Sequence, residues 1–432
     1  MADVRRTVTM LTSYLWLPVV LYIALLPTST LYNIPLLILA LPGMLIIWQD
    51  RNILHSDERI KRFGILFLCI WIPMLISLPD AVNFSRSFTK TLSFLLYFLM
   101  GVPVILYFAD ARQRRLFVVS TGILMLLWCL DAAWQAYSGV DIFGYPPRGQ
   151  LTGAFYPSLG IGLVLALLSP VFFEFIRCGC RVSRLVFLLL VPFGYIIVLA
   201  GNKNAWVLLF MSASLYMLFL YLNKSLARVR DYLFAVLAVL LLSLVVLGNI
   251  HKLAGPDNIK IIGERLGSMM ALVAGDVDKA GASFAERTEI WEGALRVGRD
   301  HWFNGVGPRG FRYSVEQYTA ADARPVWTAR AKKSTHPHQY MLEIFVETGV
   351  VGLTGYVVFM VLIIQYLVQE LREKYYEHIP WLIPMLLVTF PLSSHRSFYG
   401  SYMAPMIWMM IAVALSVMGS KREAAPTREH QP

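Results

Sequence analysis

Hydrophobic and polar positions divide this chain into long apolar runs separated by short polar loops. A run must cover about 30 Å to cross the hydrocarbon core of a bilayer. We place twelve such runs, at residues 10–26, 30–48, 63–79, 91–109, 116–137, 158–176, 185–201, 204–222, 232–250, 348–369, 381–393 and 402–418. The pattern predicts an all-α polytopic membrane protein of about 12 transmembrane helices.

One long polar stretch, residues 251–347, interrupts this alternation between the ninth and tenth runs. We interpret it as a mainly helical loop domain. The predicted organisation is therefore helices 1–9 in residues 1–250, the loop domain in 251–347, helices 10–12 in 348–418 and a tail in 419–432.

Three helices are predicted within the loop domain. Apolar residues at helical spacing between Ile259 and Val273 indicate a helix along the membrane surface. A second helix is predicted over 283–299. A third is capped by Ser334 or Thr335, has Pro337 and His338 in its first turn, and continues directly into the tenth run.

Composition agrees with a membrane protein, because 57% of residues are hydrophobic and only 15% are charged. The first run resembles a signal peptide, but eleven further runs favour an uncleaved first helix. With the N-terminus cytoplasmic, about 20 Lys and Arg residues fall inside and about five in the short outer loops. This bias predicts two cytoplasmic termini and an outward loop domain, which in a Gram-negative host would face the periplasm from the inner membrane.

The net charge of +11 follows largely from the inside clusters, which also attract anionic membrane lipid. Nucleic acid is excluded as a partner, because no compact basic domain carries interleaved aromatic residues.

Among four cysteines, Cys178 and Cys180 flank Gly179, a spacing typical of neither a redox CxxC motif nor a zinc site. No disulfide is expected.

Candidate chemistry gathers on the outer surface. An imidazole with an ordinary pKa of about 6.5 accepts a proton at neutral pH, so His338 is a candidate general base. Arg287 falls on the apolar face of the second helix, with Phe284, Trp291 and Leu295. It either binds an anion or forms an ion pair with a carboxylate, and the candidate carboxylates are Glu264, Glu343 and Glu347.

Further cations lie in the short outer loops. Arg86 and Lys90 are one helical turn apart, and Lys203 lies in a tight connection between two runs, near bilayer depth. Arg396 is expected only to reach phospholipid phosphates.

Metal and nucleotide chemistry are not expected. Asp276-Val277-Asp278 matches the DxD of metal-dependent glycosyltransferases, but its glycine-flanked setting favours a solvated turn. His336 and His338 do not share one helix face, and no third ligand is near. The glycines after Asn304 lack the Gly-Lys-Ser/Thr of a phosphate-binding loop. Cations beside a general base suit a lipid-linked diphosphate that reacts with a hydroxyl, without cofactor or metal.

At these residues the chain resembles the bacterial O-antigen ligase and polymerase superfamily. The resemblance rests on the single large outer loop, Arg287 before Ile290-Trp291, the Gly305-Val306-Gly307 loop, and His338-Gln339 running through Glu343 to Glu347-Thr348-Gly349. The family's usual His-Asn is His338-Gln339 here. Lys203 replaces an arginine that many members carry.

The resemblance implies an inverting, metal-independent glycosyltransferase that moves a glycan from undecaprenyl diphosphate to an acceptor hydroxyl, which in ligases belongs to lipid A–core. It assigns His338 as general base and Arg287, Arg265 and Lys203 as diphosphate-binding residues. Arg86 and Lys90 are candidates for donor or acceptor phosphate. The supporting residues are Gln339, Glu343 and Glu347.

Other functions remain open. An O-antigen polymerase often carries two large outer loops, so the single loop here favours a ligase. A protein O-oligosaccharyltransferase is a further alternative. A transporter or flippase would carry charges at mid-span on several helices, whereas here they gather on one surface.

Overall fold

The computed structural model describes residues 14–28, 30–148, 150–179, 184–224, 230, 282–319, 334–392 and 396–418. Within these ranges every regular element is a helix and no strand occurs. The predicted all-α class is therefore confirmed there. The ninth run, the surface helix near 259–273 and the DxD motif lie outside the described residues.

Most helices correspond to predicted hydrophobic runs. In the N-terminal half they are α2 (Trp16–Ala24), α3 (Asn33–Gln49), α4 (Ile53–Ser56), α5 (Glu58–Ile76), α6 (Phe84–Tyr107), α7 (Ala111–Ser138), η1 (Gly153–Phe155), α8 (Ile161–Leu167), α9 (Ser169–Gly179), η2 (Arg184–Leu189), α10 (Leu190–Leu199) and α11 (Lys203–Leu222). In the C-terminal half they are α14 (Ala282–Asp300), α15 (Phe311–Thr319), α17 (Tyr340–Arg372), η3 (Tyr376–His378), α18 (Ile379–Val388) and α19 (Met403–Val417).

Four of the described helices, α6, α7, α11 and α17, are long and apolar enough to cross a membrane, and the bent pair α8–α9 makes up to five. Shorter apolar helices cover Asn33–Gln49, Leu185–Leu199 and Met403–Val417. These elements agree with a membrane protein. The count of twelve spans stays a prediction.

The sixth run is broken rather than continuous. Helices α8 and α9 meet at an angle of 61° around Leu168. Pro170 lies in the first turn of α9, where its ring would clash with a carbonyl one turn earlier in a continuous helix. The sixth predicted run is therefore a bent pair of helices.

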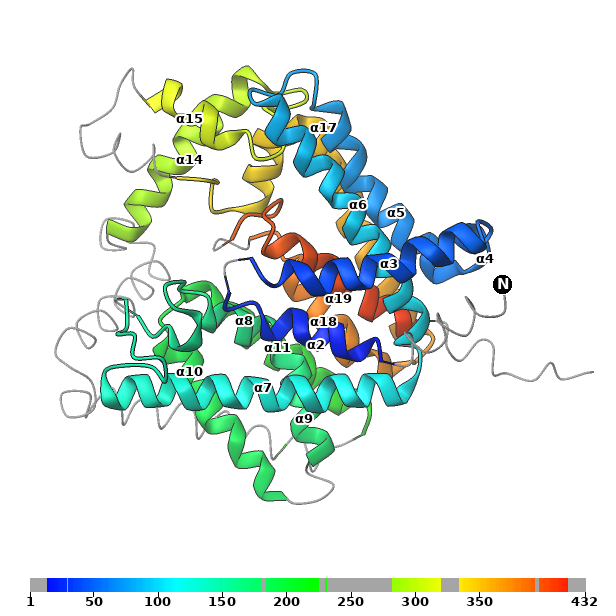
Figure 1. The fold of residues 1–432 in the computed structure, drawn as a ribbon, viewed down its shortest axis with the longest axis vertical. Helices are drawn as coiled ribbons and strands as arrows, with labels where there is room; N and C mark the ends of the chain where they lie inside the picture. The colour runs from blue at the N-terminus through cyan, green and yellow to red at the C-terminus, as the bar shows by residue number, and fades with distance from the viewer. Residues whose placement is uncertain are drawn as a thin grey trace, which may run out of the picture.

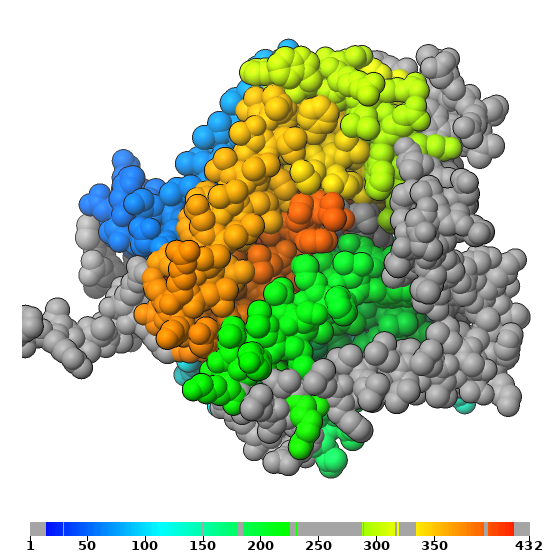
Figure 2. All heavy atoms as spheres, turned by 180° about the vertical axis from the view of Figure 1, so that it is seen from behind, coloured from blue at the N-terminus to red at the C-terminus, as the bar shows by residue number. Residues whose placement is uncertain are grey.

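Helix α19 forms the centre of the bundle and is buried along its whole length. It packs against α5, α6 and α18, while α3 runs along α6 and α5 along α17 (Figure 1). The Trp408 ring packs edge-on or tilted against Phe63, Phe67 and Phe359. On the other side α18 contacts α11, and Figure 2 shows α17 (gold), α18 (orange) and α11 (green) in succession.

A separate small core joins α14, α15 and the start of α17, above the main bundle in Figure 1. Its fully buried members are Ala294, Val297, Val306, Phe311, Val315 and Val346. Helix α14 agrees with the predicted 283–299, but Leu295, expected on the buried face, is 45% exposed. The register predicted for that face was wrong because small residues, Gly293, Ala294 and Gly298, make the close contact.

The join between this small core and the bundle is a sharp kink at Gly349. Its φ of 65° and ψ of −164° lie outside the helical region. A Cβ at Gly349 would lie 2.1 Å from the Phe303 carbonyl oxygen. The freed amides bond elsewhere, Val350 to the Trp302 carbonyl and Val351 to that of Phe303. The helix continues directly into the tenth run, as predicted, but with an unpredicted kink at Gly349, where the preceding loop packs into it.

Candidate functional site

His338 lies in the turn before α17 rather than in its first helical turn. Its φ is +57°, in the left-handed region, and α17 begins two residues later. The helix is capped by Gln339, whose side chain accepts a hydrogen bond from the Leu342 amide. The prediction that Ser334 or Thr335 caps this helix was wrong, since Gln339 takes that role.

The turn that carries His338 is held from several sides. The His336 and His338 ring centroids lie 4.0 Å apart, and the Thr335 hydroxyl lies 3.1 Å from His336 Nδ1. Trp291 on α14 donates from its indole nitrogen to the Pro337 carbonyl at 3.0 Å. Arg287 lies one helical turn before Trp291 on the same helix.

The glycine-rich loop after α14 packs tightly onto the start of α6. Gly307 has a φ of +85°, and a Cβ there would lie 2.5 Å from Ala81 Cβ and 2.6 Å from Ser87 Oγ. The Ser87 hydroxyl donates to the Pro308 carbonyl at 3.0 Å. This close approach, which only glycine allows, fixes Arg309 beside α6.

Arg309 is the functional candidate that sequence reasoning missed. Its backbone amide donates to Glu347 Oε2 at 2.6 Å. Its guanidinium donates to the Ser397 hydroxyl, 88 residues later in the chain. The only sequence signal was a cation inside a run of glycines. Its partners become apparent only when the chain is folded.

Glu343 and Glu347 are fully buried and hold this region together. The Ser397 hydroxyl donates to Glu343 Oε1, and the Phe398 amide donates to Glu343 Oε2 at 3.0 Å. A buried carboxylate is stable only with such partners. The hydrogen bonds of these carboxylates go to Ser397, Phe398 and Arg309, and the partner of Arg287 stays a prediction.

A cavity of about 460 Å³ opens beside Arg309. It is lined by Asn33, Leu36, Leu37, Arg86, Thr89, Lys90, Ser93, Leu96, Tyr97, Arg309, Tyr399 and Ser401. Lys90 Nζ lies 3.0 Å from the Tyr97 hydroxyl and about 5 Å above the Phe94 and Tyr97 rings. The predicted pair Arg86 and Lys90 thus shares one cavity with Arg309.

The cavity combines three basic side chains, Arg86, Lys90 and Arg309, with an apolar wall. No carboxylate belongs to its lining. Near it, burial and the positive charge of Arg309 lower the pKa of Arg312. Leu36, Leu37 and Leu96 form the apolar side, and Leu37 is 51% exposed on the outer face of α3. Such a cavity suits an anion attached to a hydrocarbon chain.

The other predicted cations do not line this cavity. Arg287 lies on α14, one helical turn before Trp291. Lys203 begins α11, as the predicted tight connection requires, and α11 packs against α8, α9 and α18. Arg265 lies outside the described residues. The convergence of these cations with His338 stays a prediction.

Arg396 does not follow its expected role as a lipid-facing residue. Its guanidinium donates to the Ser158 hydroxyl and stacks 4.6 Å from the Tyr402 ring centroid. It therefore joins the loop before α19 to the loop before α8. The expectation was wrong because sequence alone did not show that these loops meet.

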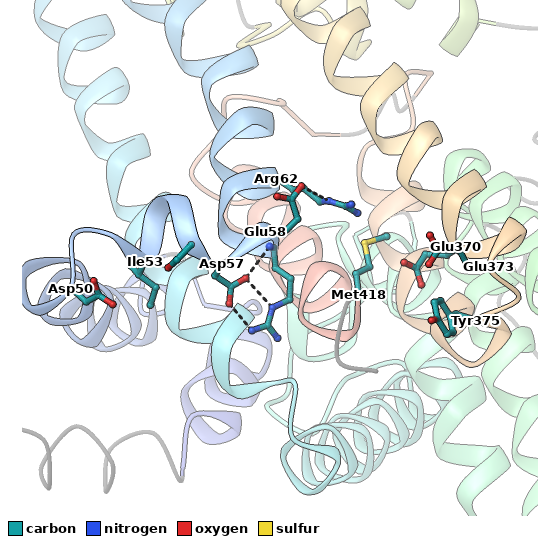
Figure 3. Close-up of a pocket in the computed structure, with 11 residues that line it drawn as sticks. Asp50, Ile53, Asp57, Glu58, Arg62, Glu370, Glu373, Tyr375 and Met418 are labelled. Carbon is teal, nitrogen blue, oxygen red and sulfur yellow. Dashed lines mark hydrogen bonds and ion pairs between the residues drawn. The ribbon is translucent and has the colours of Figure 1, made fainter. Parts of the chain in front are cut away.

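A second cavity, of about 480 Å³, lies at the opposite end of α17 (Figure 3). Two arginines and five carboxylates line it, the latter being Asp50, Asp57, Glu58, Glu370 and Glu373. Burial would raise the pKa of Asp57, but its hydrogen bond and ion pair with Arg59 hold that pKa below its ordinary value. This acidic cavity would repel a diphosphate, so the cationic cavity is the better candidate.

In the described part of the chain, no three His, Cys, Asp or Glu side chains gather as metal ligands. The described chemical groups are two neighbouring imidazoles before α17, a network of buried carboxylates and a cavity lined by basic and apolar side chains. They suit binding of an anionic lipid and transfer of a proton.

The comparisons with known proteins agree with this chemistry. Residues 185–357 match the family model described as O-antigen ligase. No curated protein matches the sequence. The matched stretch contains α14, the Arg309 loop and the His338 turn, whereas Arg86 and Lys90 precede it. Residues 185–357 therefore match an O-antigen ligase family domain, which supports the resemblance to the O-antigen ligase and polymerase superfamily.

Proposed function

We propose that this protein is an O-antigen ligase of the bacterial inner membrane. It transfers a glycan from undecaprenyl diphosphate to a sugar hydroxyl of lipid A–core on the periplasmic side. The observation that carries the proposal is the cavity in which Arg86, Lys90 and Arg309 face an apolar wall. A lipid-linked diphosphate has properties that complement this cavity, because it carries negative charge at one end and a hydrocarbon chain at the other.

Donor binding follows from this match. Arg86, Lys90 and Arg309 hold the diphosphate, and hydrogen bonds between charged groups stabilise it more than neutral ones would. The isoprenoid chain leaves the cavity past Leu36 and Leu37, toward the lipid-exposed face of α3. Arg287, Arg265 and Lys203 are further candidates for the same diphosphate.

The chemical step needs one base. The acceptor oxygen attacks the anomeric carbon of the first donor sugar, and the bond from that carbon to the diphosphate oxygen breaks. His338 takes the proton of the attacking hydroxyl, while the lipid diphosphate leaves with the bonding electrons. Attack from the face opposite the leaving group inverts the anomeric configuration. The cations stabilise the charge that develops on the leaving oxygen.

The supporting residues hold the base and the basic side chains in place. Gln339 caps α17 directly after His338 and reaches the Pro391 carbonyl at 3.4 Å. Glu343 and Glu347, in the next two turns, hold Ser397 and Arg309. The base and the cationic cavity thus belong to one hydrogen-bonded frame built on the first turns of α17. The mechanism uses no nucleotide and no divalent metal.

The test is a reaction of the purified full chain with an undecaprenyl-diphosphate glycan. Lipid A–core, a second donor molecule and a serine-containing peptide are each offered as acceptor, with and without a chelator. We expect transfer to lipid A–core alone, at a rate that the chelator does not change. Transfer to the second donor would identify a polymerase, and transfer to the peptide a protein O-oligosaccharyltransferase. Movement of the donor across a vesicle membrane without transfer would identify a flippase.

A further inference from the structure

A narrow groove of about 360 Å³ lies on the outer face of α4, α5 and α6. It uses a different face of α6 from the cationic cavity, with Leu95 and Phe98 in place of Lys90 and Tyr97. Its full lining is Leu54, His55, Ile60, Lys61, Gly64, Ile65, Phe67, Leu68, Trp71, Leu95 and Phe98. The side chains of Ile65 and Leu68 are 41% and 44% exposed, so its walls continue onto an outward apolar surface.

The groove is polar at one end only. His55 and Lys61 are its sole ionisable lining residues, and both come from the turns where α4 gives way to α5. Lys61 Nζ lies 3.7 Å from Glu58 Oε2, and both side chains are more than half exposed. Such an exposed pair is weak, so Lys61 can exchange it for a phosphate.

The length of the groove matches one leaflet of a bilayer. Lys61 and Trp71 are ten residues apart on α5, which at 1.5 Å per residue is about 15 Å. The hydrocarbon core of a bilayer is about 30 Å thick, so one leaflet contributes about 15 Å. A lipid whose phosphate meets Lys61 therefore places its acyl chain along the rest of the groove.

Aromatic side chains form the floor of the groove, and Gly64, which has no side chain, gives the groove its depth. The Phe67 ring lies between Trp71 and Phe98, with centroids 5.9 Å and 5.2 Å away, and Trp71 donates to the Thr91 carbonyl at 2.9 Å. At Gly64 an added Cβ would meet only Phe98, at 3.8 Å. The space above Gly64 is thus open, and a larger side chain there would fill it without moving the backbone.

We propose that this groove binds one anionic phospholipid from the leaflet at the Lys61 end. The phosphate bonds to Lys61 and His55, and one acyl chain lies over Gly64 toward Trp71. The cationic end selects an anionic over a zwitterionic head group, while the apolar floor selects a chain. Neither the glycan donor nor its acceptor takes part, so the proposal stands apart from the transfer reaction.

The test is native mass spectrometry of the purified full chain in detergent. Phosphatidylglycerol or phosphatidylethanolamine with identical acyl chains is added, and the occupancy of the first bound lipid is measured. Wild-type protein is expected to retain phosphatidylglycerol preferentially. Lys61→Gln is expected to weaken that binding about fivefold, as for one basic residue at a membrane surface, and Lys61→Arg to retain it.

Two further variants separate the groove from surface charge in general. Gly64→Leu keeps both cations but fills the groove, and is expected to lose the phosphatidylglycerol adduct. Arg115→Gln removes an exposed cation outside the groove and is expected to bind as wild type. Size-exclusion profiles identify any variant that has not folded. Lys61→Gln tests the polar end of the groove, and Gly64→Leu independently tests its apolar part. Equal retention of both lipids by wild type, or wild-type retention by both groove variants, would overturn the proposal.

Discussion

At the scale of single residues, Glu343 orients groups that are far from it in the sequence. Its carboxylate accepts from Ser397 and from the Phe398 amide, and Ser397 in turn accepts from the Arg309 guanidinium. Because Glu343 is buried, the loss of one of its partners would destabilise the fold by several kcal/mol. Glu343 thereby controls the direction of a cation in the cavity.

Replacing Glu343 by Gln tests this control. Gln keeps the shape of the side chain but removes its charge, so Arg309 is held less firmly. The rate of transfer is expected to fall by about ten- to hundredfold, which corresponds to the free energy of one hydrogen bond to a charged group. Initial rates at several donor concentrations measure the effect. Glu292→Gln, which removes an exposed carboxylate paired with Arg296 at 2.7 Å, is the matched control and keeps wild-type rates. Equal rates for the two variants would exclude a role for Glu343.

Arg309 itself allows a second substitution. Its φ of +67° lies in the left-handed region, which asparagine tolerates better than most residues. Arg309→Asn therefore keeps the backbone but removes the cation, and the KM for the lipid-linked donor is expected to rise about tenfold or more. Arg299→Asn, on the exposed end of α14, serves as control. An unchanged KM would remove Arg309 from the donor site.

The sequence predicted residue types better than residue partners. Arg86 and Lys90 were found because a helical period places them one turn apart, and both line the cavity. Arg309 was missed because its partners, Glu347 and Ser397, follow it by 38 and 88 residues. Contacts over such separations depend on how loops pack, which local periodicity does not encode.

At the scale of elements, breaks in helices decide where the candidate site lies. The kink at Gly349 separates the part of α17 that carries Glu343 and Glu347 from the part that runs through the bundle. Sequence predicted α14 almost to the residue, because its apolar spacing is regular. It predicted neither this kink nor the bend between α8 and α9, since both depend on tertiary packing.

Gly349→Ala tests the importance of the kink. A side chain at this combination of positive φ and extended ψ costs about 1–3 kcal/mol, and its Cβ would collide with the Phe303 carbonyl. The midpoint of thermal unfolding in detergent is expected to fall, together with transfer activity. Gly64→Ala is the control, because its Cβ has room and alanine favours a helix. Equal midpoints for both variants would show that the kink is not a constraint.

At the scale of the whole molecule, the two ends of α17 lie at cavities lined by side chains of opposite charge. The end near Glu343 faces the cationic cavity, and the end near Glu370 lies at the acidic cavity, some 27 residues or about 40 Å of helix away. This separation agrees with a reaction at one membrane face only. It also predicts on which side each end lies.

Cysteine labelling tests that orientation. In a chain without its four natural cysteines, Asp300→Cys is expected to react with a membrane-impermeant maleimide from the periplasm. Asp50→Cys is expected to react only after the inner membrane is opened. Both positions are exposed, so burial does not explain a difference. Reaction of both from the same side would contradict the predicted topology.

The most direct test of the proposed mechanism is the rate of glycan transfer by His338→Asn. Asparagine tolerates the left-handed backbone at this turn but cannot serve as a general base near neutral pH. With undecaprenyl-diphosphate glycan and lipid A–core, the rate is expected to fall by about 10²- to 10⁴-fold, while donor binding and the rate of the control His301→Asn are kept. Transfer by His338→Asn at the wild-type rate would contradict the account.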